Sequence, residues 1–214
     1  MSNDLLEQIT ASLVDSDPDG TAELTRQAIG AGMEPMTIID RGLVPGMDIV
    51  GEKFRTGEYF LPHLIIAASG MKQSMELLEP ELSRRGEKAQ TLGTAVIGTV
   101  KGDIHEIGKS LVATMIAANG FQVHDLGVDV PTEAFVAKVK ETGANLLGLS
   151  ALLTTTMTAQ REIIEALEEA GIRDQVKVMV GGAPVSQEWA RTIGADGYAE
   201  DAVGAVELCK ELVA

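Results

Sequence analysis

The chain has 214 residues, of which 45% are hydrophobic, and its 17 basic and 32 acidic side chains give a net charge of −15. This length and this apolar content suffice for one large or two small folded domains and exclude wholesale disorder. Because the acidic balance and the 3% aromatic content suit neither phosphate backbones nor base stacking, we expect no nucleic acid and no anionic membrane as a partner.

The sequence also bears on the compartment. The longest apolar runs fall well short of the roughly 20 residues that a membrane helix needs. No basic segment followed by an apolar stretch opens the chain, so we expect no signal peptide. The single cysteine, Cys209, excludes an internal disulfide framework. Together these features predict a soluble, cytoplasmic protein.

About the first 86 residues show apolar residues at helical spacing, which predicts a small helical bundle. The turn cluster Asp17–Gly20 is expected to separate the first helix from a second that starts at Thr21. A further helix is expected to start near Pro35, and Pro45-Gly46 is expected to interrupt the chain. A longer helix is predicted from Pro62 to about Arg85.

A polar stretch, residues 81–92, loses this periodicity and predicts a linker. We therefore expect a helical cap domain over residues 1–86, a linker over 87–92 and a second domain over 93–214.

The second domain alternates short apolar runs with amphipathic stretches, which predicts an α/β fold with a doubly wound, flavodoxin-like parallel sheet of five strands. The expected strands are Thr94–Val100, Gln122–Leu126, Leu146–Ser150, Val176–Val180 and Gly197–Ala199. The expected helices are Ile107–Ala118, Thr132–Lys140, Thr156–Ala170, Ser186–Ile193 and Asp201–Leu212. Ligands of such sheets bind beyond the carboxyl ends of the strands, so the loops after the first, third and fourth strands are the candidate site.

The loop after the first strand contains Asp103, Ile104, His105 and, at the start of the next helix, Gly108. Two residues apart in an extended loop, the carboxylate and the imidazole leave the backbone on the same side. Such a carboxylate fixes the proton on one ring nitrogen and raises the basicity of the other, as suits a metal ligand. The alternative for an isolated pair of this kind is a loop histidine with a local hydrogen bond.

The loops after the third and fourth strands are rich in hydroxyl groups and in glycine. Ser150, Thr154, Thr155 and Thr156 are more hydroxyl residues than one helix cap needs, so some are candidates to face a polar ligand. The pair Gly181-Gly182 serves a tight turn or leaves room for a ligand.

Other chemistries find no support in the sequence. Nucleophile-elbow, Walker and dinucleotide-binding patterns are absent. Zinc needs more ligands than the chain gathers, because His63 at a helix start and His124 within a strand suit structural roles. One strong ligand, His105, suits a metal whose other positions a macrocycle fills.

These three loops together resemble those of cobalamin-binding modules of the methionine synthase type. The motif Asp103-x-His105-x-x-Gly108, then Ser150-x-Leu152 after 41 residues and Gly181-Gly182 after a further 28, has the order and separations of that family. The helical part resembles the cap that precedes such modules. The chain is more closely similar to the corrinoid proteins of methylamine and betaine methyltransferase systems.

The resemblance implies roles for individual residues. His105 would be the lower axial ligand of cobalt, and Asp103 and Thr156 would complete a hydrogen-bond relay that couples the cobalt oxidation state to proton uptake. The remaining cofactor-binding positions fall into two groups. Ser150, Leu152, Thr154, Gly181 and Gly182, with Ile104 and Gly108 nearby, would hold the cofactor and its nucleotide tail, and Phe54 and Leu61 would cover its upper face. The alternative for Phe54 and Leu61 is ordinary bundle core.

The implied function is that of a corrinoid methyl carrier. Cob(I)alamin would accept a methyl group from a methylated amine or betaine on a substrate-specific methyltransferase. Methyl-Co(III) would then donate it to a second methyltransferase that serves coenzyme M or tetrahydrofolate, and a reductive activase would be a third partner. The chain is expected to be a carrier subunit and not catalytic alone.

Three alternatives remain open. A cobalamin-dependent mutase subunit would share the module but generally lacks the helical cap. A corrinoid light or redox sensor that regulates transcription would keep both parts but should carry a basic helix-turn-helix, which the charge distribution disfavours. The third is a structural role without a cofactor.

Overall fold

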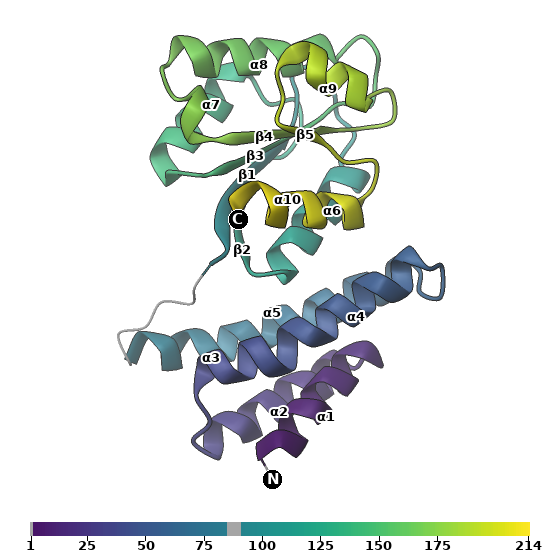
Figure 1. The fold of residues 1–214 in the computed structure, drawn as a ribbon, viewed down its shortest axis with the longest axis vertical. Coiled ribbons are helices and arrows are strands. Elements are labelled where there is room, and N and C mark those ends of the chain that lie inside the picture. The colour runs from purple at the N-terminus through teal and green to yellow at the C-terminus, as the bar shows by residue number, and fades with distance from the viewer. Residues whose placement is uncertain (1, 85–90) are drawn as a thin grey trace. The chain divides into compact units, whose positions relative to one another are not determined.

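The chain divides into two compact units, Met1–Gln90 and Thr91–Ala214, in the computed structural model (Figure 1). The structure describes residues 2–84 and 91–214. Residues 87–90 of the expected linker (residues 87–92) lie outside the described residues. In the described ranges, no helix is both long and apolar enough to cross a membrane.

The first unit is a bundle of helices that pack on one another through their apolar faces. Its elements are α1 (Ser2–Val14), α2 (Pro18–Gly30), α3 (Pro35–Ile38), a π-helical turn (Ile39–Leu43), α4 (Val44–Arg55) and α5 (Leu61–Arg84). Side chains at helical spacing on these elements are fully buried, among them Ile9, Leu13, Leu43, Leu64 and Leu78. This unit is the helical part that the sequence predicts.

The expected separation of the first two helices is confirmed, but the expected start of the second helix and the expected break at Pro45-Gly46 are wrong. The second helix begins at Pro18, not at Thr21, because Asp17 caps it by accepting a hydrogen bond from the Gly20 N–H at 3.0 Å. The chain also stays helical through Pro45-Gly46. The π-helical turn Ile39–Leu43 runs directly into α4, and Pro45 lies in the first turn of that helix, where proline is tolerated.

The long helix predicted from Pro62 is confirmed as α5, so residues 81–84 of the polar stretch are helix and not linker. Leu82 is buried one turn after the buried Leu78, and Glu81 forms an ion pair with Arg84. These residues still have an apolar side to bury, which favours the helix over a linker.

The second unit is a parallel sheet of five strands covered on both faces by helices, as predicted. The strands are β1 (Gly93–Thr99), β2 (Phe121–Asp125), β3 (Leu146–Ser150), β4 (Lys177–Gly181) and β5 (Gly197–Tyr198), in the spatial order β2-β1-β3-β4-β5. The helices are α6 (Ile107–Ala118), α7 (Thr132–Thr142), α8 (Thr158–Glu169), α9 (Gln187–Ile193) and α10 (Ala202–Val213), with a 3-10 turn at Arg173–Gln175.

The helices of the second unit form two layers. α7, α8 and α9 cover one face of the sheet, and α6 and α10 cover the other (Figure 1). The strands are nearly continuous apolar runs because both faces are buried. The chain leaves β1 for one edge and later returns to its other side with β3, so the strand order reverses between β1 and β3. Ligands of doubly wound sheets bind at the carboxyl ends of the strands at such a switch.

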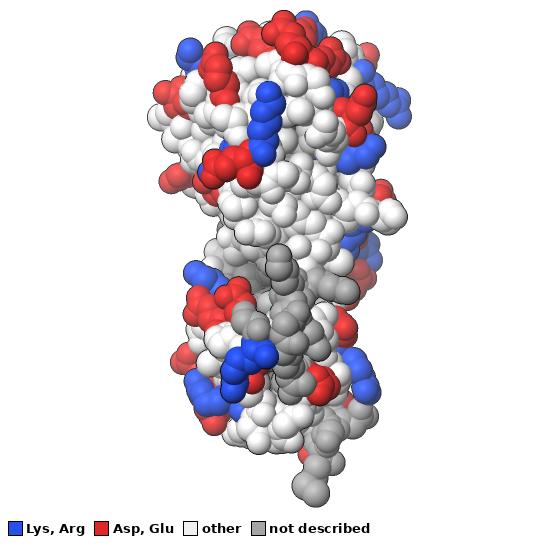
Figure 2. Space-filling view, turned by 90° about the vertical axis from the view of Figure 1, so that its left-hand side faces the viewer, with Lys and Arg blue, Asp and Glu red and all other residues white. Residues whose placement is uncertain are grey.

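Charged side chains are mixed in sign on the face of the molecule that Figure 2 shows. Lysines and arginines lie beside acidic residues there and do not gather into a basic patch. On α7 of the second unit, Lys138 and Glu141 form an ion pair.

Candidate functional site

Side chains from two loops meet at the carboxyl ends of β1 and β3. The strands run in register, with Thr99 opposite Ser150, so the loops that follow them emerge side by side. The first loop carries Asp103 and His105, and the second carries Leu152, Leu153 and the residues up to α8. The candidate site thus lies at the switch in strand order.

The Asp103 carboxylate is the centre of this arrangement. It is fully buried, and each oxygen accepts hydrogen bonds from a different loop. Oδ1 accepts from the His105 backbone N–H at 3.1 Å and lies 2.7 Å from the ring Nδ1 of His105. Oδ2 accepts from the N–H groups of Leu152 at 2.7 Å and Leu153 at 3.3 Å. The carboxylate therefore ties the two loops together.

The ionisation of Asp103 follows from these contacts. Burial opposes the charged form and by itself raises the pKa of the carboxyl. The hydrogen bonds from His105, Leu152 and Thr156 outweigh burial and hold the pKa of Asp103 well below its usual range. The group is therefore an anion at neutral pH and acts only as an acceptor.

The His105 ring takes its tautomer from this acceptor. Since an ionised carboxylate only accepts, Nδ1 must carry the proton, and Nε2 then holds a free electron pair. The side chain is 47% exposed, and within the part of the chain that the structure describes, no protein group hydrogen-bonds Nε2. An exposed imidazole nitrogen with its far side fixed by a carboxylate has the form of a metal ligand.

Thr156 adds a hydroxyl to the same carboxylate. Its Oγ1 lies 2.8 Å from Asp103 Oδ2 and 3.0 Å from the Leu153 carbonyl oxygen, so its one proton can go to either acceptor. Thr156 is buried, whereas Thr154 and Thr155 are exposed. The expected helix start at Thr156 is two residues early, because α8 begins at Thr158.

The glycines after β4 allow the loops after β3 and β4 to approach closely. Gly181 pairs with Ser150 in the sheet, and its carbonyl accepts from the Ala151 N–H at 3.1 Å. Gly182 has φ +127°, and a Cβ there would lie 1.8 Å from the Ala151 carbonyl oxygen. Gly182 is therefore required by the fold itself, whatever else it contacts.

The two loops that meet at Asp103 and the start of α6 also expose apolar side chains. Ile104 and Ile107 are 73% and 82% exposed, and Leu152 and Leu153 are about 40% exposed. A Cβ on Gly108 would have no neighbour within 4 Å, so the start of α6 is open to a ligand. Exposed apolar side chains on the same loops as a free imidazole nitrogen suit a large, flat macrocycle that carries a metal. Among the described residues, no three His, Cys, Asp or Glu side chains gather as a metal site of another kind.

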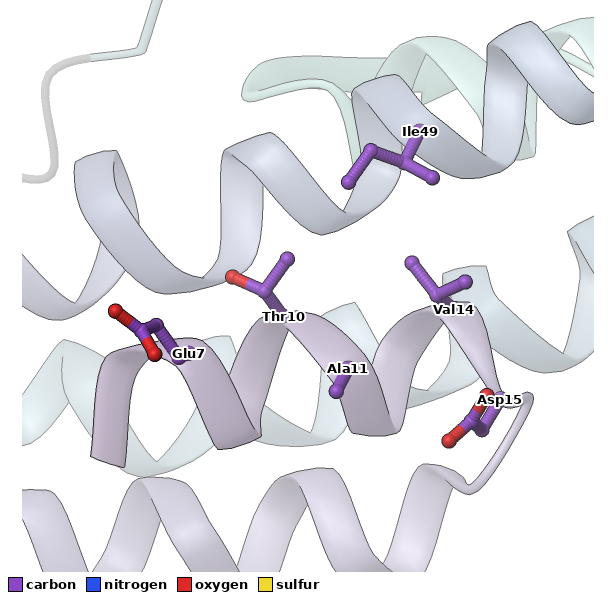
Figure 3. A pocket seen from close by; sticks show the side chains of 6 residues that line it. All are labelled: Glu7, Thr10, Ala11, Val14, Asp15 and Ile49. Atoms are coloured by element: carbon purple, nitrogen blue, oxygen red, sulfur yellow. The ribbon is translucent and has the colours of Figure 1, made fainter. Parts of the chain in front are cut away.

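The cap residues stand apart from this group in the chain. Phe54 on α4 and Leu61 at the start of α5 are both half-buried. A shallow hollow of the cap is lined by α1 and its following turn and by Ile49 of α4, which points across it (Figure 3). That hollow contains none of the residues predicted for the site.

Several positioning contacts lie outside the residues predicted from the motifs. The Thr99 hydroxyl donates to the His105 carbonyl oxygen at 2.9 Å. The buried Lys109, next to Gly108, pairs with Asp125 at the end of β2. Asp129, in the loop after β2, accepts a hydrogen bond from the Gly102 N–H in the turn that precedes Asp103. A lysine in an apolar helix face was a signal for the second contact, whereas Thr99 and Asp129 have no local signature.

Comparisons with known proteins cover both units. Two family models, each described as a B12 binding domain, match residues 93–207 and residues 5–79. Trimethylamine corrinoid protein 1 of Methanosarcina acetivorans is 48% identical over 98% of this chain and 97% of its own length. Dimethylamine corrinoid protein 2 of the same organism is 49% identical over 98% and 96%. A chain of the methanol:cobalamin methyltransferase complex of Methanosarcina barkeri superposes with a TM-score of 0.87 at 33% identity, covering 98% of this chain and 80% of that one.

Proposed function

The chain belongs to the corrinoid proteins with B12 binding domains, and from this premise we propose that it carries methyl groups between two methyltransferases. The donor would be a methylated amine bound to a substrate-specific methyltransferase. The acceptor enzyme would serve coenzyme M or tetrahydrofolate, and a reductive activase would restore the reduced cofactor. We place this activity in the cytoplasm, where a free, buried thiol such as Cys209 stays reduced.

One observation carries the proposal: the exposed Nε2 of His105, with Nδ1 bound to a buried and saturated carboxylate. The bound corrinoid supplies the cobalt that takes up and releases the methyl group. His105 would bind that cobalt through Nε2. Ile104, Ile107 and Gly108 would contact the macrocycle, since the two isoleucines are exposed and the space beside Gly108 is open.

The protein's own part is to control one proton. Asp103 holds it at Nδ1 of His105, and Thr156 holds the other oxygen of Asp103 in place. While the proton stays at Nδ1, Nε2 is free to bind a metal. A proton at Nε2 would exclude a metal from that nitrogen, so the relay would link metal binding by His105 to the protonation of its ring.

The proposed donor class rests on the relatives. Two of the relatives are named as a trimethylamine corrinoid protein and a dimethylamine corrinoid protein, and both match this chain over nearly its whole length. This similarity favours methylated amines over glycine betaine. It also favours a carrier with a helical cap over a mutase subunit, because the match includes residues 5–79.

Cofactor binding is tested first, by mixing the protein with hydroxocobalamin, removing the unbound cofactor and recording the visible spectrum. The wild type should retain about one corrinoid per chain with the spectrum of an imidazole-ligated form. His105→Ala should change that spectrum. His124→Ala, in β2 of the same unit, is the matched control and should leave it unchanged. A wild type that retains no corrinoid would end the proposal.

The carrier role is tested with the loaded, reduced protein and a methylated amine. Methylation of the cofactor should require an added methyltransferase, and turnover by this protein alone would contradict a carrier. Because the net charge is −15, complexes with partners that have basic rims should weaken as salt rises. An affinity that is unchanged between low and high ionic strength would exclude this electrostatic contribution.

A further inference from the structure

Asp129, in the loop between β2 and α7, has an unusual backbone conformation. Its φ is +53°, in the left-handed region that residues other than glycine seldom adopt. Aspartate and asparagine tolerate this region better than other side chains, but it still costs free energy. Such a conformation persists where surrounding contacts hold it, and it clusters at functional sites.

Two hydrogen bonds hold Asp129 against the loop that carries the site. Its Oδ1 accepts from the Gly102 N–H at 2.7 Å, and its own N–H donates to the Asp103 carbonyl oxygen at 2.9 Å. Asp129 thus binds the chain immediately before and at Asp103. The neighbouring Val130 pairs with Val100 as an isolated parallel bridge, so the backbone there is anchored independently of the Asp129 side chain.

The turn that Asp129 contacts contains a conformationally flexible glycine, Gly102. The Asp103 N–H donates to the Val100 carbonyl oxygen at 3.1 Å, which closes a turn with Gly102 at φ +83°. A glycine in such a turn has wide conformational freedom, so an external acceptor for its N–H restricts the loop. Asp129 itself is exposed and lies outside the predicted ligand-binding residues.

From this geometry, and resting on the proposed function, we infer that Asp129 is a positioning residue for the axial histidine. Its carboxylate fixes the Gly102 N–H, its backbone fixes the Asp103 carbonyl, and Asp103 in turn fixes the His105 ring. The loop is then held from two sides, by the loop after β2 through Asp129 and by the loop after β3 through the Asp103 carboxylate. Without the acceptor of Asp129, the ring would hold its orientation for a smaller fraction of the time.

Three variants separate the acceptor from the backbone conformation. Asp129→Asn keeps an oxygen acceptor and the tolerance of positive φ. Asp129→Gly keeps the conformation without the acceptor, and Asp129→Ala loses both. Ser16→Gly relieves the other positive φ outside glycine among the described residues, at +58° in the cap, and is the matched control.

Each variant is loaded with hydroxocobalamin, and the ratio of histidine-ligated to unligated corrinoid is taken from the visible spectrum. This ratio should fall about tenfold in Asp129→Gly and Asp129→Ala, the size expected for loss of one hydrogen bond to a charged acceptor. It should stay within about twofold of wild type in Asp129→Asn and Ser16→Gly. In the apo protein, amide hydrogen exchange at Gly102 should accelerate about tenfold in the same two variants.

Two results would overturn the inference: wild-type ratios and exchange in Asp129→Gly, or an equal loss in Asp129→Asn. An effect confined to Asp129→Ala would trace to φ strain and would overturn it too. The His105→Ala spectrum distinguishes this failure from that of the proposed function. If His105→Ala matches wild type, histidine ligation itself is wrong, and the exchange rate of Gly102 alone then decides whether Asp129 holds the turn.

Discussion

Replacing Asp103 with asparagine should move the proton of the His105 ring to the nitrogen that faces solvent. The side chain keeps its shape, but one oxygen becomes an NH2 group that donates. Turned toward Leu152 and Leu153, this NH2 group would face two backbone N–H groups, which can only donate and so cannot pair with it. Turned toward His105, it meets one backbone N–H and the ring Nδ1, which accepts once the tautomer changes. The second orientation is favoured, and Nε2 then carries the proton.

The size of the effect follows from the contacts that change. Ligation of a metal now requires the disfavoured tautomer, and the charged acceptor of the Nδ1 proton is lost, at about 1.5–3 kcal/mol. The His105 backbone N–H also faces a donor and loses its partner, which lowers the stability of the variant by about 1–3 kcal/mol whether or not a metal is bound. Only the first loss, about 1.5–3 kcal/mol, enters the ligation equilibrium, and it corresponds to a roughly 10- to 150-fold weaker histidine ligation.

The assay is the visible spectrum of the hydroxocobalamin-loaded protein, with thermal unfolding of the apo protein measured alongside. Asp196→Asn is the matched control, because Asp196 Oδ2 also accepts from a backbone N–H, that of Val178, at 2.7 Å and from Arg173 at 2.8 Å. It should lower the unfolding temperature without changing the ligation. A wild-type spectrum in Asp103→Asn would refute the tautomer argument.

Four further predictions concern single contacts. Thr156→Val should weaken ligation about fivefold in the same spectrum, and Thr156→Ser should restore it, since one neutral donor to the carboxylate is lost and regained. Gly182→Ala should destabilise the apo protein by about 3 kcal/mol or more in denaturant unfolding, because its Cβ would overlap the Ala151 carbonyl oxygen; unchanged stability would contradict that overlap. Gly108→Ala should leave apo stability unchanged or slightly higher, yet reduce corrinoid retention, and full retention would show that the start of α6 does not face the cofactor. Burial raises the pKa of Cys209 to about 12, so the native thiol should not react with a disulfide reagent at pH 8 until the protein unfolds, and rapid reaction would disprove its burial.

The fold of the second unit follows closely from the sequence because its signals are local. Residues 107–118 and 146–150 form the predicted helix and strand with the predicted ends. In the first unit, prolines predicted the ends of helices less well. Pro18 follows a real break and opens α2 after the Asp17 cap, whereas Pro45 lies in the first turn of α4 and the chain stays helical through it.

In the site too, contacts between residues close in the sequence could be predicted, whereas contacts between distant residues could not. The pairing of Asp103 with His105 is local, so the spacing of two residues is enough to predict it. The contact of Thr156 with Asp103 spans 53 positions of the chain, and the sequence alone suggests it only through resemblance. Asp129 has neither source of support, since no motif marks it and its partner Gly102 lies 27 positions away.

Sheet topology explains why these distant residues meet. β1 lies between β2 and β3, and parallel strands in register bring their following loops to the same edge. The loop after β1 therefore has a neighbour on each side: the Asp103 carboxylate is fixed from one of them, and the backbone before it is fixed from the other. Because Asp103 in turn holds the ring of His105 at Nδ1, the exposed Nε2 side of the ring is left for a ligand.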